Sequence, residues 1–329
     1  MAKRVGNLMP KIADLDNIMS AYCNARRGKQ TKAEVLAFSK DINSNILRLH
    51  DELISGDITV GRYTYFEIHD PKKRLICAAD FRERVLHHSI INICKPYFER
   101  HLIYDTYATR EGKGVYSAID KARIAMRKYP YVAKLDVRKY FDSINHAILK
   151  KALERLFKDR QLLNLFNKII DSYSTTPGCG IPIGNLTSQY FANYYLSILD
   201  HYVKEHLRVP VYVRYMDDML LFGTSHEDVA QYVRGVESFV NEKLSLTLKQ
   251  PQICSSRNGV AFLGYKIYAN KILLNRRSKL RFVRRAKQYK QNLDAGVWNE
   301  KVYFEHIIPL LAFVEKAYTR QLRASLQYA

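Results

Sequence analysis

The stretch VPVYVRYMDDMLLF at residues 209–222 decides the fold of this chain. Two adjacent carboxylates, Asp217 and Asp218, lie between two runs of apolar and β-branched residues. Such runs are typical of strands, so the stretch predicts a β-hairpin with the acidic pair at its tip. Neighbouring residues of a regular strand point to opposite faces, whereas two residues at a tight turn can face one cation. We expect a cation because burying two charges between apolar strands is otherwise unfavourable.

A third carboxylate ends another predicted strand. Residues 131–137 read YVAKLDV, an apolar run that reaches Asp136. If this strand lies beside the hairpin, three carboxylates meet at one place. Hard oxygen ligands suit Mg²⁺, and two such ions ~3.5–4 Å apart stabilise the attacking and leaving oxygens of a phosphoryl displacement. The sequence therefore predicts Asp136, Asp217 and Asp218 as catalytic residues that bind two Mg²⁺ ions.

The charge of the chain points to a polyanionic partner. The 329 residues carry 53 Lys and Arg against 32 Asp and Glu, a net charge of +21, and 47% are hydrophobic. This composition indicates a globular protein with a real core and excludes a disordered one. This charge argues against a small uncharged ligand as the sole partner, and nucleic acid is the simplest polyanion.

Basic residues concentrate near the C-terminal end. Residues 243–293 contain 13 Lys or Arg and no Asp or Glu. Such a run is often only a solvated face, but its length favours a nucleic-acid-binding surface. Ser278 is a candidate cap for a helix in this region. The residues expected to contact nucleic-acid phosphates here are Arg276, Arg277, Arg281, Arg284 and Arg285.

The chain shows no sign of membrane insertion or export. No stretch approaches the ~18 apolar residues of a membrane-spanning helix, and no apolar segment follows the basic start. The five cysteines are scattered and form no CxxC pair, so the sequence supports neither a zinc ribbon nor a disulfide scaffold. These features predict a cytoplasmic protein with reduced thiols and no membrane partner.

Helices and strands alternate without a strict βαβ order, which predicts an α+β fold. Besides the strands above, we expect strands at 63–68 and 74–78 and two more between 260 and 274. Helices are expected at 81–98 with an end near Pro96, at 148–157, at 186–207 and at 228–244.

The tetrapeptide YMDD at 215–218 resembles the YxDD box of reverse transcriptases, and its apolar flanks match as well. Other sequence blocks of that family also occur in this chain, in the order in which the family carries them, at 80–84, 107–114, 136–141 and 262–265. The resemblance implies a right-hand polymerase with an antiparallel palm sheet. Fingers would occupy 1–130, the palm 131–270 and a helical thumb 271–329. It also implies an RNA-directed DNA polymerase that uses dNTPs, a template RNA and a cDNA primer.

Several further roles follow for the site. The resemblance implies that the backbone of Val137 joins the aspartates in binding metal. It also implies that Phe141 excludes a ribose 2′-hydroxyl. The alternative for Phe141 is an ordinary role in the hydrophobic core. A basic cluster after Pro71 is suited to triphosphate oxygens, although it is also consistent with a solvated turn. The residues of interest in that cluster are Lys72 and Arg74. Arg110 and Lys113, near flexible glycines, are expected to approach template or primer phosphates.

The block IGNLTSQ at 183–189 narrows the resemblance. Most reverse transcriptases carry Q-G-x-x-x-S-P there, whereas this pattern resembles the enzymes of diversity-generating retroelements. It implies nucleotide contacts by Ile183, Gly184 and Gln189, errors at template adenines, and a ring-forming, small basic accessory variability protein as partner. Ile183 cannot make the hydrogen bonds of a glutamine, so with Arg74 it is expected to lower fidelity. Two alternatives stay open: a retron or group II intron enzyme, and a non-catalytic RNA-binding protein on a polymerase scaffold.

Overall fold

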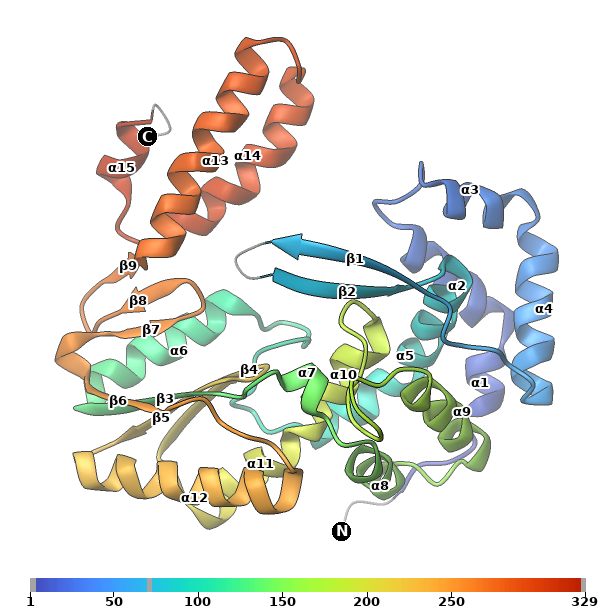
Figure 1. Cartoon of the computed structure of the whole chain (residues 1–329), viewed down its shortest axis with the longest axis horizontal. Helices are drawn as coiled ribbons and strands as arrows, with labels where there is room; N and C mark the ends of the chain where they lie inside the picture. Colours follow the sequence, from blue (N-terminus) through green and yellow to red (C-terminus); the bar gives the residue numbers. More distant parts are fainter. Residues whose placement is uncertain (1–3, 70–72, 327–329) are drawn as a thin grey trace. The chain divides into compact units, whose positions relative to one another are not determined.

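The computed structural model describes residues 4–69 and 73–326. The chain divides into two compact units. The first unit comprises Met1–Tyr104, Val137–Tyr202 and Glu237–Leu248, and the second comprises Asp105–Asp136, Val203–Val236 and Lys249–Ala329. Helices and antiparallel strands occur in both units, which confirms the α+β class (Figure 1). None of the helices in the described ranges combines the length and hydrophobicity needed to cross a membrane.

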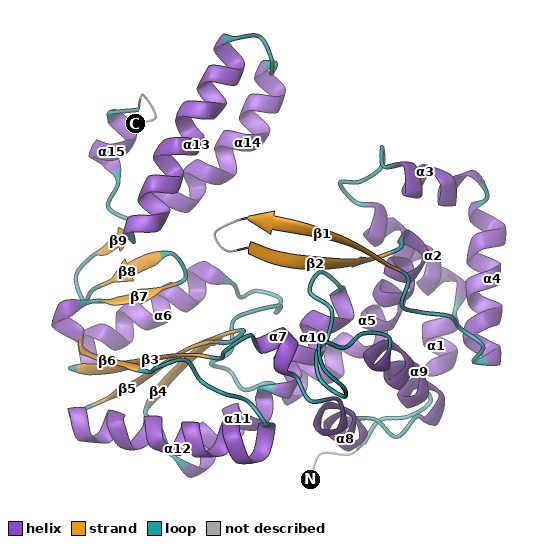
Figure 2. Cartoon of the chain, viewed as in Figure 1, coloured by secondary structure: helices purple, strands orange, loops and turns teal. Residues whose placement is uncertain are grey.

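The first unit begins with four helices followed by a two-stranded hairpin (Figure 2). Asp14 starts the second of these helices by accepting hydrogen bonds from the backbone N–H groups of Asp16 and Asn17. The hairpin strands pair in an antiparallel register, and both confirm strands predicted from the sequence. The elements are α1 (Met9–Ala13), α2 (Leu15–Arg26), α3 (Ala33–Lys40), α4 (Ile42–Ser55), β1 (Tyr63–His69), β2 (Lys73–Ala79) and α5 (Phe81–His101).

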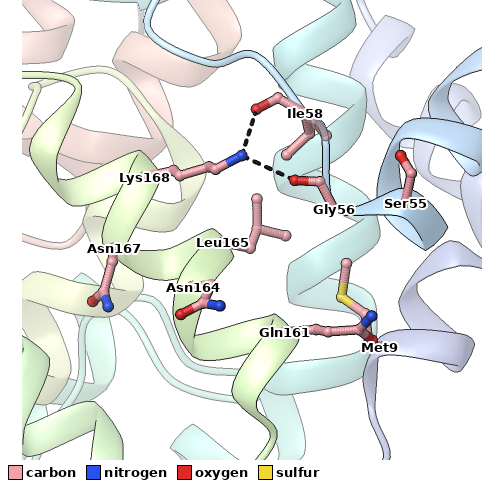
Figure 3. A pocket seen from close by; sticks show the side chains of 9 residues that line it. All are labelled: Met9, Ser55, Gly56, Ile58, Gln161, Asn164, Leu165, Asn167 and Lys168. Carbon is pink, nitrogen blue, oxygen red and sulfur yellow. Dashed lines mark hydrogen bonds between the residues drawn. The ribbon is translucent and has the colours of Figure 1, made fainter.

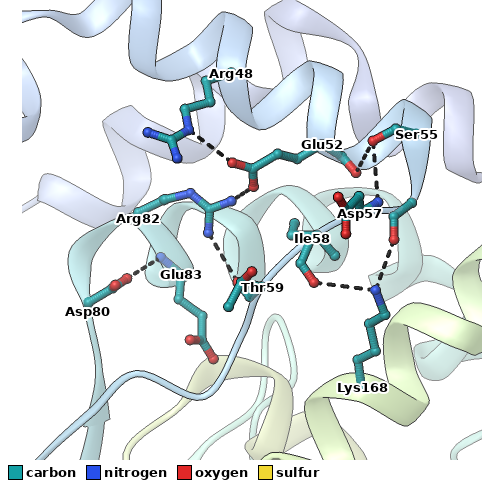
Figure 4. Close-up of polar contacts among 11 residues, drawn as sticks. Arg48, Glu52, Ser55, Asp57, Ile58, Thr59, Asp80, Arg82, Glu83 and Lys168 are labelled. Atoms are coloured by element: carbon teal, nitrogen blue, oxygen red, sulfur yellow. Dashed lines mark hydrogen bonds and ion pairs between the residues drawn. The ribbon is translucent and has the colours of Figure 1, made fainter.

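Polar contacts from α5 hold the base of the hairpin (Figure 4). The buried Glu83 accepts a hydrogen bond from Gly61 N at 2.8 Å, two residues before β1. Arg82 forms an ion pair with Glu52 of α4 and donates a hydrogen bond to the carbonyl of Thr59 at 3.2 Å. The segment that enters the hairpin is therefore tied to two helices, while most of the hairpin surface is exposed.

Two helix predictions in the first unit are wrong in their bounds. Helix α5 continues past Pro96 to His101, because a proline inside a helix removes only one backbone donor and the surrounding helix is buried. The helix expected at 186–207 is broken near Leu196 into α10 and α11, followed by a π-helical turn at Tyr202–His206. The remaining helices of this unit are α7 (Tyr140–Ser143), α8 (His146–Leu156), α9 (Arg160–Asp171), α10 (Leu186–Tyr195) and α11 (Ser197–His201).

The second unit is built on a four-stranded antiparallel sheet in the order β4-β5-β3-β6. Central strand β5 is buried on both faces, and α6 packs its apolar side into the same core as the sheet. Val132, Leu220 and Phe222 lie in that core. The elements are α6 (Val115–Lys128), β3 (Tyr131–Asp136), β4 (Val211–Tyr215), β5 (Asp218–Gly223) and β6 (Gln252–Ser255). Helix α12 (His226–Leu244) follows β5, and its residues from Glu237 onward belong to the first unit.

A smaller sheet and three helices complete the second unit. The sequence predicted two strands between 260 and 274, and the structure has three, because the chain turns again after β8. Asn275, and not Ser278, caps α13: its side-chain oxygen accepts a hydrogen bond from Ser278 N at 2.8 Å. The elements are β7 (Val260–Phe262), β8 (Tyr265–Ile267), β9 (Ile272–Leu274), α13 (Arg276–Asp294), α14 (Glu300–Glu315) and α15 (Arg320–Ala324).

Candidate active site

Strand register gathers the acidic residues of the second unit. Strands β3 and β5 are neighbours, and Asp136 lies directly opposite Asp218. Tyr215 pairs with Asp218 in the β4–β5 hairpin, so Met216 and Asp217 form its two-residue tip. Met216 has a φ of 53°, a left-handed conformation that is strained for a side chain of this size. Two strand ends and one tight turn thus bring the three carboxylates to one edge of the sheet.

Arg214 supports this turn from inside the protein. Its side chain is fully buried, and its Nη1 donates a hydrogen bond to the carbonyl of Met216 at 3.1 Å. Its backbone is paired on both sides with residues 105–107, through Asp105 O at 3.0 Å and Tyr107 N at 2.9 Å. No role for Arg214 was predicted from the sequence, where the available signal is its place one residue before the YMDD box.

Burial opposes the charged forms of the carboxylates at the hairpin tip. Burial, together with the nearby charges of Asp218 and Asp136, raises the pKa of Asp217 to about 6. Burial also raises the pKa of Asp218, whereas the Lys134 ammonium lowers it. A cation that binds here stabilises the charged forms and reverses the effect of burial.

Two lysines pair with the carboxylates. The ammonium of Lys134 lies 3.4 Å from Asp218 Oδ1. Lys249 forms an ion pair with Asp136, and its backbone N–H donates to the carbonyl of the same residue at 2.8 Å. The sequence did not single out Lys134, although it lies two residues before Asp136 and therefore on the same face of the strand.

The carboxylates provide the donors that a divalent metal ion needs. All three supply hard oxygens, and the buried Asp218 Oδ1 accepts no hydrogen bond from the described residues. Within the described ranges, no group of three His, Cys, Asp or Glu side chains lies close enough together to enclose a metal ion. The ion pairs of Lys134 and Lys249 account for two of the three carboxylates. Asp136, Asp217 and Asp218 are the residues that would hold the metal.

In the first unit, the block at 183–189 is attached to strand β2. The carbonyl of Ile183 accepts a hydrogen bond from Cys77 N at 2.9 Å. Gly184 has a φ of 121°, and a Cβ there would lie only 3.0 Å from Ile76 Cγ2, so the close approach requires glycine. The buried Asn185, which the sequence did not single out, accepts a hydrogen bond from Ala79 N at 3.1 Å.

The other predicted nucleotide contacts also belong to the first unit. Arg74 is exposed on β2, opposite Ile68, and Gln189 is exposed on α10. Phe141 is half-buried in the short helix α7, and its carbonyl accepts a hydrogen bond from Ile181 N at 2.9 Å. Lys72 lies outside the described residues. Val137 follows β3 directly, is buried, and forms an isolated bridge with Leu248.

The predicted phosphate contacts lie in the second unit. Arg110 donates a hydrogen bond to Thr106 Oγ1 at 2.7 Å, and the Lys113 ammonium lies 5.1 Å from the centre of the Tyr107 ring. Helix α13 carries the five predicted arginines. Of these, Arg276, Arg277 and Arg284 are exposed, whereas Arg281 and Arg285 are half-buried.

A separate cavity of about 460 Å³ lies in the first unit, between α1, the end of α4 and α9 (Figure 3). Lys168 reaches across it and donates hydrogen bonds to the carbonyls of Gly56 at 2.9 Å and Ile58 at 3.4 Å. Gln161, Asn164 and other uncharged side chains line the rest. None of its lining residues was predicted to act in catalysis or binding.

Comparison with known proteins gives one family match. The model of the family "Reverse transcriptase (RNA-dependent DNA polymerase)" matches residues 68–267. Protein YkfC of Escherichia coli is 23% identical over 79% of this chain and 81% of its own length. The putative COX1/OXI3 intron 1 protein of Saccharomyces cerevisiae is 22% identical over 79% of this chain, which spans only 39% of that protein.

Among solved structures, telomerase from Candida albicans, in a complex with a fragment of telomeric RNA, is similar with a TM-score of 0.49 and 13% identity. The similarity covers 73% of this chain and 52% of the telomerase chain.

Proposed function

The chain belongs to the reverse transcriptase (RNA-dependent DNA polymerase) family, and on that premise we propose that it copies an RNA template into DNA. The fold is the right-hand α+β polymerase fold of this family. The observation that carries the proposal is the register of β3 and β5, which places Asp136 opposite Asp218 beside the turn that holds Asp217. Proteins of this family generally use divalent metal ions, and here we propose two Mg²⁺ ions.

The side chains at the hairpin tip have a defined task in this reaction. Asp136, Asp217 and Asp218 would hold the ions, with the backbone carbonyl of Val137 as a further ligand. Mg²⁺ ions held by these groups would favour deprotonation of a primer 3′-hydroxyl and would neutralise charge on the departing pyrophosphate. The buried Arg214 holds the turn, so that the carboxylates keep their positions while the substrates change. Preorganised charge of this kind is the main source of rate enhancement in phosphoryl transfer.

We assign the remaining predicted residues by their chemistry. Fingers at 1–130 and palm at 131–270 would bind the dNTP, and the thumb at 271–329 would bind the template RNA and cDNA primer. Arg74 and Lys72 would contact the triphosphate, and Phe141 would exclude a ribose 2′-hydroxyl. The remaining nucleic-acid contacts would come from Arg110, Lys113 and the five arginines of α13.

Primer extension tests the activity. We expect the purified protein, with Mg²⁺, dNTPs and a primed RNA template, to extend the primer. Asp217→Asn and Asp218→Asn should each lower the rate at least a hundredfold, because each removes a charged metal ligand. Asp228→Asn, which changes a carboxylate at the start of α12 in the same unit that is hydrogen-bonded to Thr224 and Ser225, serves as the matched control and should extend normally. Folded protein that binds RNA but never extends the primer would instead support a non-catalytic binding role.

We further propose that the enzyme serves a diversity-generating retroelement. In this role it copies a template-repeat RNA with errors at adenines, together with a small basic accessory protein that forms a ring. The support is the block at 183–189, whose Ile183 backbone is fixed against β2 while the side chain cannot form amide hydrogen bonds. Loss of polar contacts at that position loosens the selection of the incoming nucleotide.

Ile183→Gln tests this subtype. We expect the variant to extend RNA with fewer errors opposite adenine, by roughly three- to tenfold, since one restored hydrogen bond is worth about 1 kcal/mol. Ile181→Leu, a conservative change at a buried site two residues earlier, is the control. Sequencing of the cDNA gives the error spectrum. An unchanged adenine error frequency in a folded, active Ile183→Gln variant would contradict the assigned role.

A second candidate is an enzyme of the retron or group II intron type. It is favoured by the names of relatives such as the yeast COX1/OXI3 intron 1 and intron 2 proteins, both about 22% identical to this chain. The same cDNA sequencing separates the two roles, since faithful copying at adenines favours the second.

A further inference from the structure

Lys134 is placed by strand geometry against one carboxylate of the catalytic site. It lies two residues before Asp136 on β3, so both side chains leave the strand on the same face. The register pairs Lys134 with Leu220 and Asp136 with Asp218, so that Lys134 is the diagonal cross-strand neighbour of Asp218. Its ammonium lies 3.4 Å from Asp218 Oδ1, the oxygen that accepts no hydrogen bond from the described residues.

This ion pair differs from an ordinary surface pair. Only 22% of the Lys134 side chain and 29% of the Asp218 side chain are exposed. Exposed pairs contribute little because water and salt screen them, whereas partly buried charges interact more strongly. Lys249 pairs in the same way with Asp136, but 42% of its side chain is exposed. Lys134 is therefore the better shielded of the two positive charges beside the carboxylates.

We propose that Lys134 is a positioning residue that acts as a built-in counter-ion at the metal site. It fixes the orientation of the Asp218 carboxylate before any metal arrives and competes with the divalent ion for Oδ1. The free protein consequently binds divalent metal more weakly than its three carboxylates alone would allow. This inference rests on the proposed function, because it assumes that the carboxylates bind metal.

Direct measurement of Mn²⁺ binding tests the proposal without any polymerase assay. Free Mn²⁺ is followed by electron paramagnetic resonance at pH 7.5 with full-length protein and no nucleotide. Lys134→Met should bind Mn²⁺ roughly tenfold more tightly, because a unit charge about 6 Å from a divalent ion disfavours it to about this extent even in water. Lys134→Arg retains the charge and should bind as weakly as the parent protein.

Lys266→Met is the matched control. Lys266 is a strand lysine of the same unit, but its ammonium lies over the ring of Tyr268 at 5.4 Å and forms no ion pair with a carboxylate of the described residues. This control should leave Mn²⁺ affinity within twofold of the parent. If Lys134→Met does not fold, Lys134→Gln replaces it and is judged by the same criterion.

The outcomes separate this inference from the proposed function. If the parent protein binds Mn²⁺ and Asp218→Asn abolishes that binding, the metal site of the proposed function is supported. Equal affinity in Lys134→Met and the parent would then overturn the counter-ion role alone. Affinity that rises as much in Lys134→Arg as in Lys134→Met would also overturn it, since charge would not be the cause. A parent protein without Asp218-dependent binding would overturn both proposals.

Discussion

At the scale of single residues, Asp217 makes the metal-free protein sensitive to pH. Its pKa is raised to about 6, mainly by burial, with smaller contributions from the charges of Asp218 and Asp136 that Lys249 partly offsets. An unfolded aspartate has a pKa near 3.9, so the native state binds more protons between about pH 4 and 6. Stability from this group is therefore fully present below about pH 4 and is lost as the pH rises through about 6. The loss at neutral pH is on the order of 3 kcal/mol.

Urea denaturation in EDTA between pH 4 and pH 7.5 checks this prediction. Asp217→Asn should be more stable than the parent protein at pH 7, and the difference should shrink toward pH 4. Asp228→Asn should instead be less stable than the parent at pH 7 and keep most of that deficit at pH 4, because hydrogen bonds from Thr224 and Ser225 lower the pKa of that carboxyl and its stabilisation is lost only below about pH 4. An Asp217→Asn advantage that stays constant over this pH range would refute the prediction.

The site residues that could be predicted from the sequence differ in one physical respect from the site residues that could not. Asp136, Asp217 and Asp218 stand out because a carboxylate beside an apolar strand needs compensation wherever the strand lies. Lys134 and Arg214 acquire their partners only through the pairing of strands and the path of a turn. A one-residue shift of β3 against β5 would turn Lys134 to the other face. No local pattern in the sequence fixes that register, so these two residues could not be assigned in advance.

At the scale of elements, the positions of apolar runs and of the turn residues between them predicted the strands better than the helices. The hairpin at 209–222 and the strand that became β3 follow from apolar runs that end at turns or charges. The break near Leu196 has no glycine or proline to mark it, and the segment is buried on nearly all sides. Such a segment has no polar face from which its period can be read. At Pro96 the sequence predicted a helix end that the structure does not have, because the burial of α5 outweighs the one hydrogen bond that the proline removes.

At the scale of the whole molecule, a net charge of +21 predicts RNA binding that weakens steeply with salt. Part of this charge lies on α13, where Arg277 and Arg284 are exposed and are seven residues apart, on one face of the helix. Each phosphate contact that is lost reduces the slope of log affinity against log salt by about 0.7 to 0.9. Replacing both residues with glutamine should therefore lower the slope by roughly 1.5 and weaken binding equally for all sequences.

Binding of a primed RNA template, measured by fluorescence anisotropy from 50 to 300 mM KCl, gives this slope. Arg234→Gln is the matched control, because Arg234 is equally charged and exposed but forms an ion pair with Glu227 at 3.0 Å. That control should leave the slope unchanged, since its charge is already compensated within α12. If Arg277→Gln/Arg284→Gln retains the parent slope, α13 is only a solvated basic face, and the phosphate contacts must come from other parts of the chain.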